Sequence, residues 1–420
     1  MSAVTGGAAP AAPATPDWTD RVLDLDVGAV AHGGHCVARV PGDDGRERVL
    51  FVRHALPGER VRAVVTEDRG GFGRADAVAV LAAAPGRVEP PCPWARAGGC
   101  GGCDTQHADG PTQRALKTAV LREQLTRLAG LTDADLTALG LAAGTTAVEE
   151  LPGRDGSSPL LGWRSRVRLA VDADGRPGLR AHRSHDVLPV ADCPIAPEGL
   201  LPPVLAQEFP PGSEIEVVQD ADGTRHVHAA DATDRVVQRA AGREWHLSPG
   251  TFWQVHPALA DTLAAVVGEW AHAPAGGVAW DLYGGVGLFA AVLADQVGPD
   301  GAVAVVESSP QAVADGRAAL ADLPQVRFRT GRVERELPNL PGRPDVVVAD
   351  PPRRGLGRAL VAALCAREPG RVVHVACDPA ALARDVALFA GHGYRLAALR
   401  AFDAFPMTHH LEAVALFLPG

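Results

Sequence analysis

The chain has 420 residues, of which 46% are hydrophobic and 21% charged, and its formal net charge at pH 7 is −10. This length predicts two or three domains, and the composition is that of a soluble globular protein. The negative charge disfavours an indiscriminate nucleic-acid binder, and seven unevenly placed cysteines do not indicate a secreted disulfide framework.

Residues 1–17 are rich in alanine and proline, and we expect them to form a disordered tail. They lack the basic and apolar regions of a signal peptide, and no apolar run in the chain is long enough to span a bilayer. We therefore expect a cytoplasmic protein without a membrane partner. Residues 18–85 alternate like short strands separated by turns, which predicts five or so strands. This pattern fits a small β-barrel of the oligonucleotide-binding kind, and equally any other small barrel.

Residues 86–250 are expected to form a central α+β domain that contains a cysteine cluster. Cys92, Cys100 and Cys103 lie in CPWARAGGCGGCDTQH, and Cys193 in ADCPI is the candidate fourth ligand. Four thiolates hold either zinc or an iron–sulfur cluster, and the spacing alone does not choose between them. A zinc site made of the first three cysteines and His107 is a further possibility.

Two other patterns stand out in this central region. The stretch at 111–130 has apolar residues spaced near 3.6 and predicts a helix. Residues 162–195 alternate like hairpin strands, so that Arg164, Arg166 and Arg168 would share one face beside Trp163. That face is either a basic binding stripe or the side of a solvated edge strand.

Residues 251–420 alternate strand and helix patterns, which predicts an α/β domain with a doubly wound, Rossmann-like parallel sheet. The short last connection predicts that the sheet ends in an antiparallel hairpin. Polar or reactive residues follow the strands: the turn DLYGGVG at 281–287, then Glu307, Asp350 and Cys377, while Glu412 opens the last strand. These residues would share the edge where nucleotide-like ligands bind. The absence of a Gly-Lys-Ser/Thr sequence argues against an ATPase, and a dinucleotide enzyme is an alternative.

The motifs DLYGGVG, ADPPRRG, HVACDPA and FPMTHHLEAV, in this order, resemble those of the RNA 5-methyluridine methyltransferases. TFWQVHP, CGGCDTQH and CPI strengthen the resemblance, which runs from about residue 18 to 418 and includes an N-terminal barrel similar to a TRAM domain. It implies a class I enzyme that uses S-adenosylmethionine, with ribosomal or transfer RNA as partner, and we expect a monomer. It also implies a [4Fe–4S] cluster on the four cysteines, in preference to zinc. The implied cofactor-binding residues are Gln254, Tyr283, Glu307 and Asp350.

By the same resemblance, Cys377 is the nucleophile and Glu412 the base. The thiolate would add to C6 of uracil, C5 would accept the methyl group, and Glu412 would remove the C5 proton so that Cys377 can leave. The target base would have to leave its stack. Two other functions compete: a methyltransferase with a small-molecule or protein acceptor, and a cluster-containing RNA-binding protein with an inactive methyltransferase domain.

Overall fold

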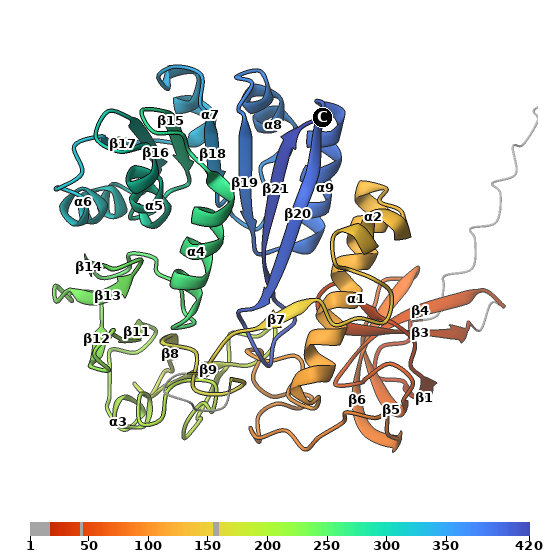
Figure 1. The fold of residues 1–420 in the computed structure, drawn as a ribbon. Helices are drawn as coiled ribbons and strands as arrows, with labels where there is room; N and C mark the ends of the chain where they lie inside the picture. The colour runs from red at the N-terminus through yellow and green to blue at the C-terminus, as the bar shows by residue number, and fades with distance from the viewer. Residues whose placement is uncertain (1–16, 43–44, 154–158) are drawn as a thin grey trace, which may run out of the picture. The chain divides into compact units, whose positions relative to one another are not determined.

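The computed structural model describes residues 17–42, 45–153 and 159–420. The chain forms two compact units that divide after Arg87 (Figure 1). The expected disordered tail lies outside the described residues, apart from Asp17. The expected domain boundaries at residues 85 and 250 stay predictions.

The first unit is a six-stranded sheet with the strand order β1-β5-β6-β4-β3-β2, one strand more than the five or so expected. Two hydrogen bonds, from Gly28 N to Val37 O and from Val37 N to Ala29 O, join the segment after β1 to β3 and close the sheet. Alternate residues of β5 point inward, where Val61, Ala63 and Val65 are fully buried. The strands are β1 (Val22–Asp26), β2 (Val30–Ala31), β3 (His35–Pro41), β4 (Glu47–Arg53), β5 (Arg60–Asp68) and β6 (Phe72–Ala82).

The second unit contains two small antiparallel sheets between residues 166 and 247. One sheet has the order β10-β9-β8-β11-β12, and the other is the ribbon β13-β14. A short helix, α3, precedes β11. Their bounds are β8 (Arg166–Val171), β9 (Pro177–Arg180), β10 (Val187–Leu188), α3 (Pro202–Leu205), β11 (Glu214–Gln219), β12 (Arg225–His228), β13 (Val236–Ala240) and β14 (Arg243–Leu247).

Neither sequence interpretation of the arginines near β8 is fully correct. β8 pairs with β11 on one side and with β9 on the other, so it is not an edge strand. The Arg166 side chain is largely buried and donates to Thr251 O at 2.5 Å, whereas Arg168 is exposed. Trp163 is buried as well and stacks against the His256 ring at a centroid distance of 6.2 Å.

The large sheet has eight strands in the order β17-β16-β15-β18-β19-β21-β20-β7. The five strands from β17 to β19 are parallel, and β21 is antiparallel to both β19 and β20, which confirms the doubly wound sheet and its final hairpin. The eighth strand, β7, was not foreseen and pairs in parallel with β20. The bounds are β7 (Val148–Glu150), β15 (Val278–Leu282), β16 (Ala302–Glu307), β17 (Val326–Thr330), β18 (Val346–Ala349), β19 (Arg371–Ala376), β20 (Tyr394–Asp403) and β21 (Glu412–Pro419).

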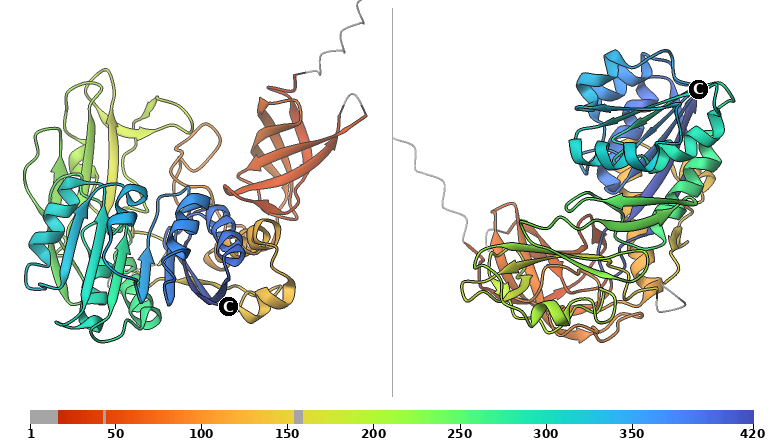
Figure 2. Two further views of the ribbon diagram at one scale, coloured as in Figure 1. Left: turned by 90° about the horizontal axis from the view of Figure 1, so that it is seen from above. Right: turned by 90° about the vertical axis from the view of Figure 1, so that its left-hand side faces the viewer.

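Helices cover both faces of this sheet, and each face has its own apolar core (Figure 2). One core contains α4 (Leu259–Ala271), α5 (Leu288–Val297) and α6 (Pro310–Ala319). The other contains α1 (Gly110–Ala129), α2 (Asp133–Ala138), α7 (Val333–Glu336), α8 (Gly357–Cys365), α9 (Pro379–Gly391) and the 3-10 turn Leu337–Asn339. Helix α1 confirms the helix expected at 111–130. None of the helices in the described residues is long and apolar enough to cross a membrane.

Candidate active site

The carboxyl ends of β15, β16, β18 and β19 meet at one edge of the large sheet. Asp350 and Cys377 directly follow β18 and β19, while Glu307 ends β16. Because β21 is antiparallel to β19 and Ala413 lies opposite Ala376, Glu412 at the start of β21 comes beside Cys377. The strand pairing therefore brings these four predicted site residues to the same edge.

The glycine turn after β15 has the shape of a ligand cradle. A Cβ on Gly284 would lie 2.5 Å from Val305 Cγ1 and 2.8 Å from Asp281 Oδ2, so only glycine fits there. Gly285 has φ +55°, and a Cβ there would meet nothing within 4 Å, which leaves open space beside the turn. The backbone of this turn is fixed by Glu307, whose Oε2 accepts from Gly285 N at 3.2 Å. A partly exposed glycine turn that leads into a helix, next to an acid at the end of the next strand, fits the nucleoside part of S-adenosylmethionine.

Burial raises the pKa of three carboxyl groups at this edge, those of Asp281, Asp350 and Glu412. Burial raises the pKa of Asp281 to about 7, and the neighbouring Asp350 and Glu307 act in the same direction. Burial also raises the pKa of Glu412 well above its ordinary value, and the negative charge of Asp350 raises it further. The Oε1 atom of Glu412 is buried and has no hydrogen-bond partner among the described residues. A group with these properties points to a site whose polar partner is a ligand.

Cys377 is partly exposed at the end of β19. Burial raises the pKa of its thiol to about 12, and the charges of Glu412 and Asp350 contribute, whereas Arg353 lowers it. The cysteine is therefore protonated at neutral pH in the free protein. The positive group beside it, Arg353, is exposed and lies 3.3 Å from the His410 ring through Nη2.

The other two predicted cofactor-binding residues are Tyr283 and Gln254. Tyr283 follows β15 with φ +61°, and burial raises the pKa of its hydroxyl to about 12. Gln254 lies between β14 and α4, and within the described residues its side chain makes no hydrogen bond to the other site residues. The segment around it is fixed at both ends, because Thr251 Oγ1 donates to Asp315 at 2.9 Å and Ser165 Oγ donates to Val255 O at 2.8 Å.

The raised thiol pKa leads to a prediction for Arg353→Met. With a pKa near 12, about one Cys377 thiol in 10⁴ is ionised at pH 8, so alkylation by iodoacetamide should be slow and should accelerate up to pH 10. Arg353→Met should slow it severalfold further, because the positive charge that lowers the pKa is removed. Arg354→Met is the matched control, since Arg354 pairs with Glu334 at 2.9 Å. Mass spectrometry of the Cys377 peptide measures the rate, and equal rates in the two variants would contradict the assignment.

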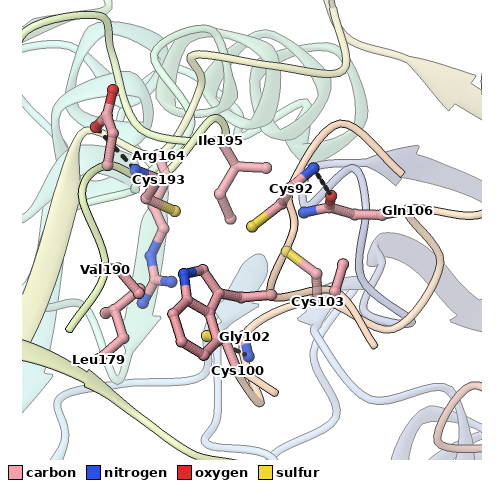
Figure 3. Close-up of a pocket in the computed structure, with 13 residues that line it drawn as sticks. Cys92, Cys100, Gly102, Cys103, Gln106, Arg164, Leu179, Val190, Cys193 and Ile195 are labelled. Atoms are coloured by element: carbon pink, nitrogen blue, oxygen red, sulfur yellow. Dashed lines mark hydrogen bonds between the residues drawn. The ribbon is translucent and has the colours of Figure 1, made fainter. Parts of the chain in front are cut away.

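The four predicted metal ligands line one pocket (Figure 3). Cys92, Cys100 and Cys103 come from the loop before α1, and Cys193 comes from the segment after β10. None of the four forms a disulfide within the described residues. Burial raises the pKa of both Cys103 and Cys193, and Arg164 at the pocket wall lowers it in each case. Four cysteines in one pocket with an arginine at its wall suit an anionic metal–thiolate centre.

The sulfur positions bear on the kind of metal centre. Zinc bonds to sulfur at about 2.3 Å, which places tetrahedral ligand sulfurs about 3.8 Å apart. Among the described residues, only His226, His228 and Asp234 bring three potential ligand atoms within 4.8 Å of one another. No three of these cysteines lie that close together. His107 does not join them either. No three of these side chains are therefore arranged as a preformed tetrahedral zinc site.

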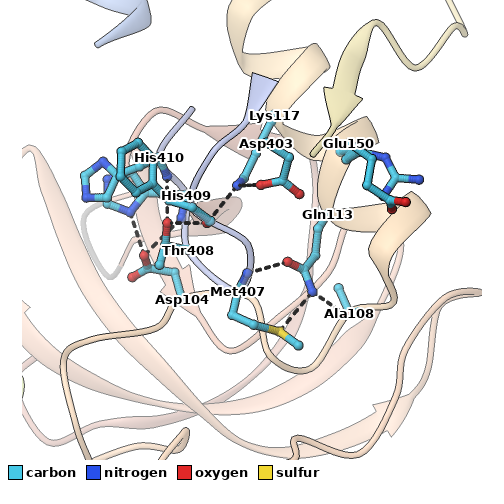
Figure 4. A network of polar contacts seen from close by, with 12 residues as sticks. Asp104, Ala108, Gln113, Lys117, Glu150, Asp403, Met407, Thr408, His409 and His410 are labelled. Atoms are coloured by element: carbon cyan, nitrogen blue, oxygen red, sulfur yellow. Dashed lines mark hydrogen bonds and ion pairs between the residues drawn. The ribbon is translucent and has the colours of Figure 1, made fainter. Parts of the chain in front are cut away.

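Hydrogen bonds join the loop that contains Cys92, Cys100 and Cys103 to the segment that leads into β21 (Figure 4). The backbone N–H groups of Asp104 and Thr105 donate to Met407 O at 2.9 and 3.1 Å, and His409 Nδ1 lies 2.6 Å from Asp104 Oδ2. Met407 adopts φ +67°, and its N–H donates to Gln113 Oε1 at 2.7 Å. The cysteine loop and α1 together therefore set the conformation of the chain that precedes Glu412.

Sequence reasoning missed these supporting residues. Asp104 and Met407 lie within the quoted motifs CGGCDTQH and FPMTHHLEAV, but nothing in either motif indicates that the two segments contact each other, and Gln113 lies outside both. Lys117 stands out in the sequence because it is the only lysine in the chain. It is buried, and its Nζ donates to Asp403 at 2.5 Å and to Phe405 O at 3.0 Å. A single lysine among arginines is consistent with a position that needs a compact ammonium group.

Family models agree with this arrangement at both ends of the chain. The model described as TRAM domain matches residues 20–78, and that described as tRNA (Uracil-5-)-methyltransferase matches residues 343–418. A protein of Streptomyces avermitilis described as an uncharacterized RNA methyltransferase is 44% identical, over 94% of this chain and 98% of its own. The 23S rRNA (uracil(1939)-C(5))-methyltransferase RlmD of Chromohalobacter salexigens is 33% identical, over 93% and 88%.

The chain belongs to the RNA uracil-C5 methyltransferase family. The fold agrees: the crystal structure of a Pyrococcus abyssi tRNA (uracil-54, C5)-methyltransferase in complex with S-adenosyl-L-homocysteine matches 94% of this chain and all of its own, with a TM-score of 0.66 at 20% identity. The predictions of a methyltransferase that uses S-adenosylmethionine and of an N-terminal TRAM domain are thereby confirmed. The expected cytoplasmic location and monomeric state stay predictions.

Proposed function

We propose that this methyltransferase modifies C5 of one specific uridine through a covalent bond between Cys377 and C6, with Glu412 as the base. The observation that carries the proposal is the register that places Glu412 beside Cys377, at the sheet edge that also holds the glycine turn. S-adenosylmethionine supplies the methyl group, and the turn at 284–285 with Glu307 would hold its nucleoside part.

Cys377 and Glu412 have separate roles in the proposed reaction. Uracil C5 is a poor nucleophile, so addition of the Cys377 sulfur to C6 is needed to give C5 enolate character before it takes the methyl group. The C5 proton must then be removed so that the bond between sulfur and C6 can break. Because its pKa is raised, ionised Glu412 binds that proton more strongly than an exposed glutamate would.

Glu412→Gln should therefore trap the protein on its RNA. The amide cannot take the C5 proton, so the methylated adduct at Cys377 should accumulate instead of being released. A denaturing gel with labelled RNA should show a slow-migrating band. Glu334→Gln, which changes a half-exposed carboxylate paired with Arg354, should give none. If both variants lacked the band, and 5-fluorouridine RNA gave none either, Glu412 would not be the base.

We further propose ribosomal RNA as the first substrate to test, and transfer RNA as the second. Relatives that match over most of both chains are named for 23S rRNA, while the family model of the C-terminal region is named for tRNA. Anaerobically purified protein would be incubated with labelled S-adenosylmethionine and unmodified transcripts of each class, followed by nucleoside analysis. Label in 5-methyluridine supports the proposal. Label in another nucleoside or in a non-RNA acceptor overturns it, and RNA binding without label favours an inactive RNA-binding protein.

The same proposal includes a [4Fe–4S] cluster on Cys92, Cys100, Cys103 and Cys193. Its support is the position of all four cysteines on the wall of one pocket, together with the family resemblance. No step of methyl transfer needs an electron. We therefore propose a structural role, in which these cysteines fix the loop whose Asp104 and Thr105 hold Met407, and through it Glu412.

Cys193→Ser should remove iron and lower kcat by about 10²-fold, because the chain before Glu412 would lose its fixed position. Binding of S-adenosylmethionine should change little, since the glycine turn belongs to other strands. Cys36→Ser, in the buried core of the first unit, is the control and should retain iron. Iron analysis, calorimetry and turnover measure the three effects. An iron-free variant with unchanged kcat would contradict the structural role.

A further inference from the structure

A second group of potential metal ligands lies on β12 and in the segment after it, and includes none of the four cysteines. His226 and His228 alternate on this strand and so point to the same face, with ring centroids 6.1 Å apart. Asp234, in the segment before β13, lies between them: its Oδ2 is 2.8 Å from His226 Nδ1 and 3.4 Å from His228 Nε2. One ligand atom from each of the three residues lies within 4.8 Å of the others.

The other ring nitrogen of each histidine faces a further carboxylate. Asp220 Oδ2 is 3.0 Å from His226 Nε2, and Glu216 Oε2 is 3.9 Å from His228 Nδ1. Both carboxylates come from β11 or the turn after it. Metal-binding histidines characteristically direct their second ring nitrogen at a carboxylate, which fixes the tautomer and makes the first nitrogen a better ligand.

Protonation alone does not explain the arrangement. A protonated His226 would donate hydrogen bonds to both Asp220 and Asp234, so protonation would account for the contacts of that residue. His228, however, has a side chain only 4% exposed, and neither of its ring nitrogens makes a hydrogen bond within the described residues. A buried histidine without hydrogen bonds, facing a second histidine and a carboxylate, lacks a partner that a cation would supply.

We propose that His226, His228 and Asp234 bind one divalent first-row transition-metal ion, with solvent completing the coordination. Two imidazole nitrogens and one carboxylate oxygen are a donor set that suits zinc. The Asp234 side chain is 54% exposed, which gives the ion a path from solvent. The ion would tie β12 to the segment before β13, and so stabilise the region between the small sheet and the methyltransferase sheet.

Zinc titration of the full-length, anaerobically purified protein tests this site. Competition with a chromophoric chelator should show one tight zinc ion per chain in the wild type, and none in Asp234→Asn or His226→Gln. Asp220→Asn should keep the ligands but weaken zinc binding about 10–100-fold. His246→Gln is the matched control, because His246 is exposed and faces a single carboxylate, Glu244, at 2.8 Å.

Cobalt distinguishes this site from the cysteines. Co²⁺ bound to the wild type should give visible d–d bands without a thiolate charge-transfer band, and these bands should be absent in Asp234→Asn. Zinc should also raise the Tm of the wild type and of His246→Gln, but not that of Asp234→Asn. Equal zinc stoichiometry in the wild type and Asp234→Asn, or a cobalt spectrum dominated by thiolate bands, overturns the proposal.

Discussion

Replacing Cys377 with alanine is expected to lower methyl transfer by about 10⁴-fold or more, which is the size of effect seen when a covalent nucleophile is removed. Without the sulfur there is no addition at C6, and C5 stays too weak a nucleophile. Affinity for S-adenosylmethionine should stay within about twofold of the wild type, because the groups proposed to hold it come from β15 and β16. The variant should also form no adduct with 5-fluorouridine RNA.

Cys365→Ala is the control for this experiment. Cys365 is a second cysteine of the same unit that is not a predicted metal ligand, and it is buried at the end of α8, away from the strand edge that holds Cys377. Its replacement should leave turnover within severalfold of the wild type. Single-turnover assays with labelled S-adenosylmethionine give the rates, and calorimetry gives the affinity. A Cys377→Ala enzyme with a near-normal rate would exclude the covalent mechanism.

Replacing Lys117 with methionine is expected to destabilise the second unit by about 3–5 kcal/mol, the usual cost of breaking a buried ion pair from one side. The side chains of Lys117 and Asp403 are 3% and 1% exposed, so the carboxylate would be left without a counterion. Lys117 also donates to Phe405 O. Burial lowers the pKa of Lys117, and the interaction with Asp403 opposes that shift.

A second substitution separates the loss of charge pairing from the loss of packing. Lys117→Met combined with Asp403→Leu should recover most of the stability, because an apolar pair can replace a buried ion pair at little cost. Arg122→Met, on the same helix, breaks a pair with the exposed Asp133 and should cost less than about 1 kcal/mol. Urea unfolding followed by tryptophan fluorescence measures these free energies. A double variant no more stable than Lys117→Met would show that the pair itself is not what stabilises this contact.

The amino-acid sequence by itself determined the class of fold and most of the candidate active site. Alternating strand and helix patterns predict parallel strands, and the carboxyl ends of parallel strands must share one edge. Residues that directly follow successive strands, such as Glu307, Asp350 and Cys377, are therefore brought together by topology alone. The cysteine loop was equally visible, because Cys92, Cys100 and Cys103 are close in the chain.

Only the tertiary structure decided which distant segments support that site. Met407 and Gln113 are 294 residues apart, Lys117 and Asp403 are 286 apart, and β7 joins a strand more than 250 positions beyond it. The grouping of His226, His228 and Asp234 likewise depends on how the chain returns after β12. Local patterns report the periodicity of one element, whereas these contacts arise from the packing of several elements against each other. Their partners are set by that packing, and no spacing in the sequence encodes them.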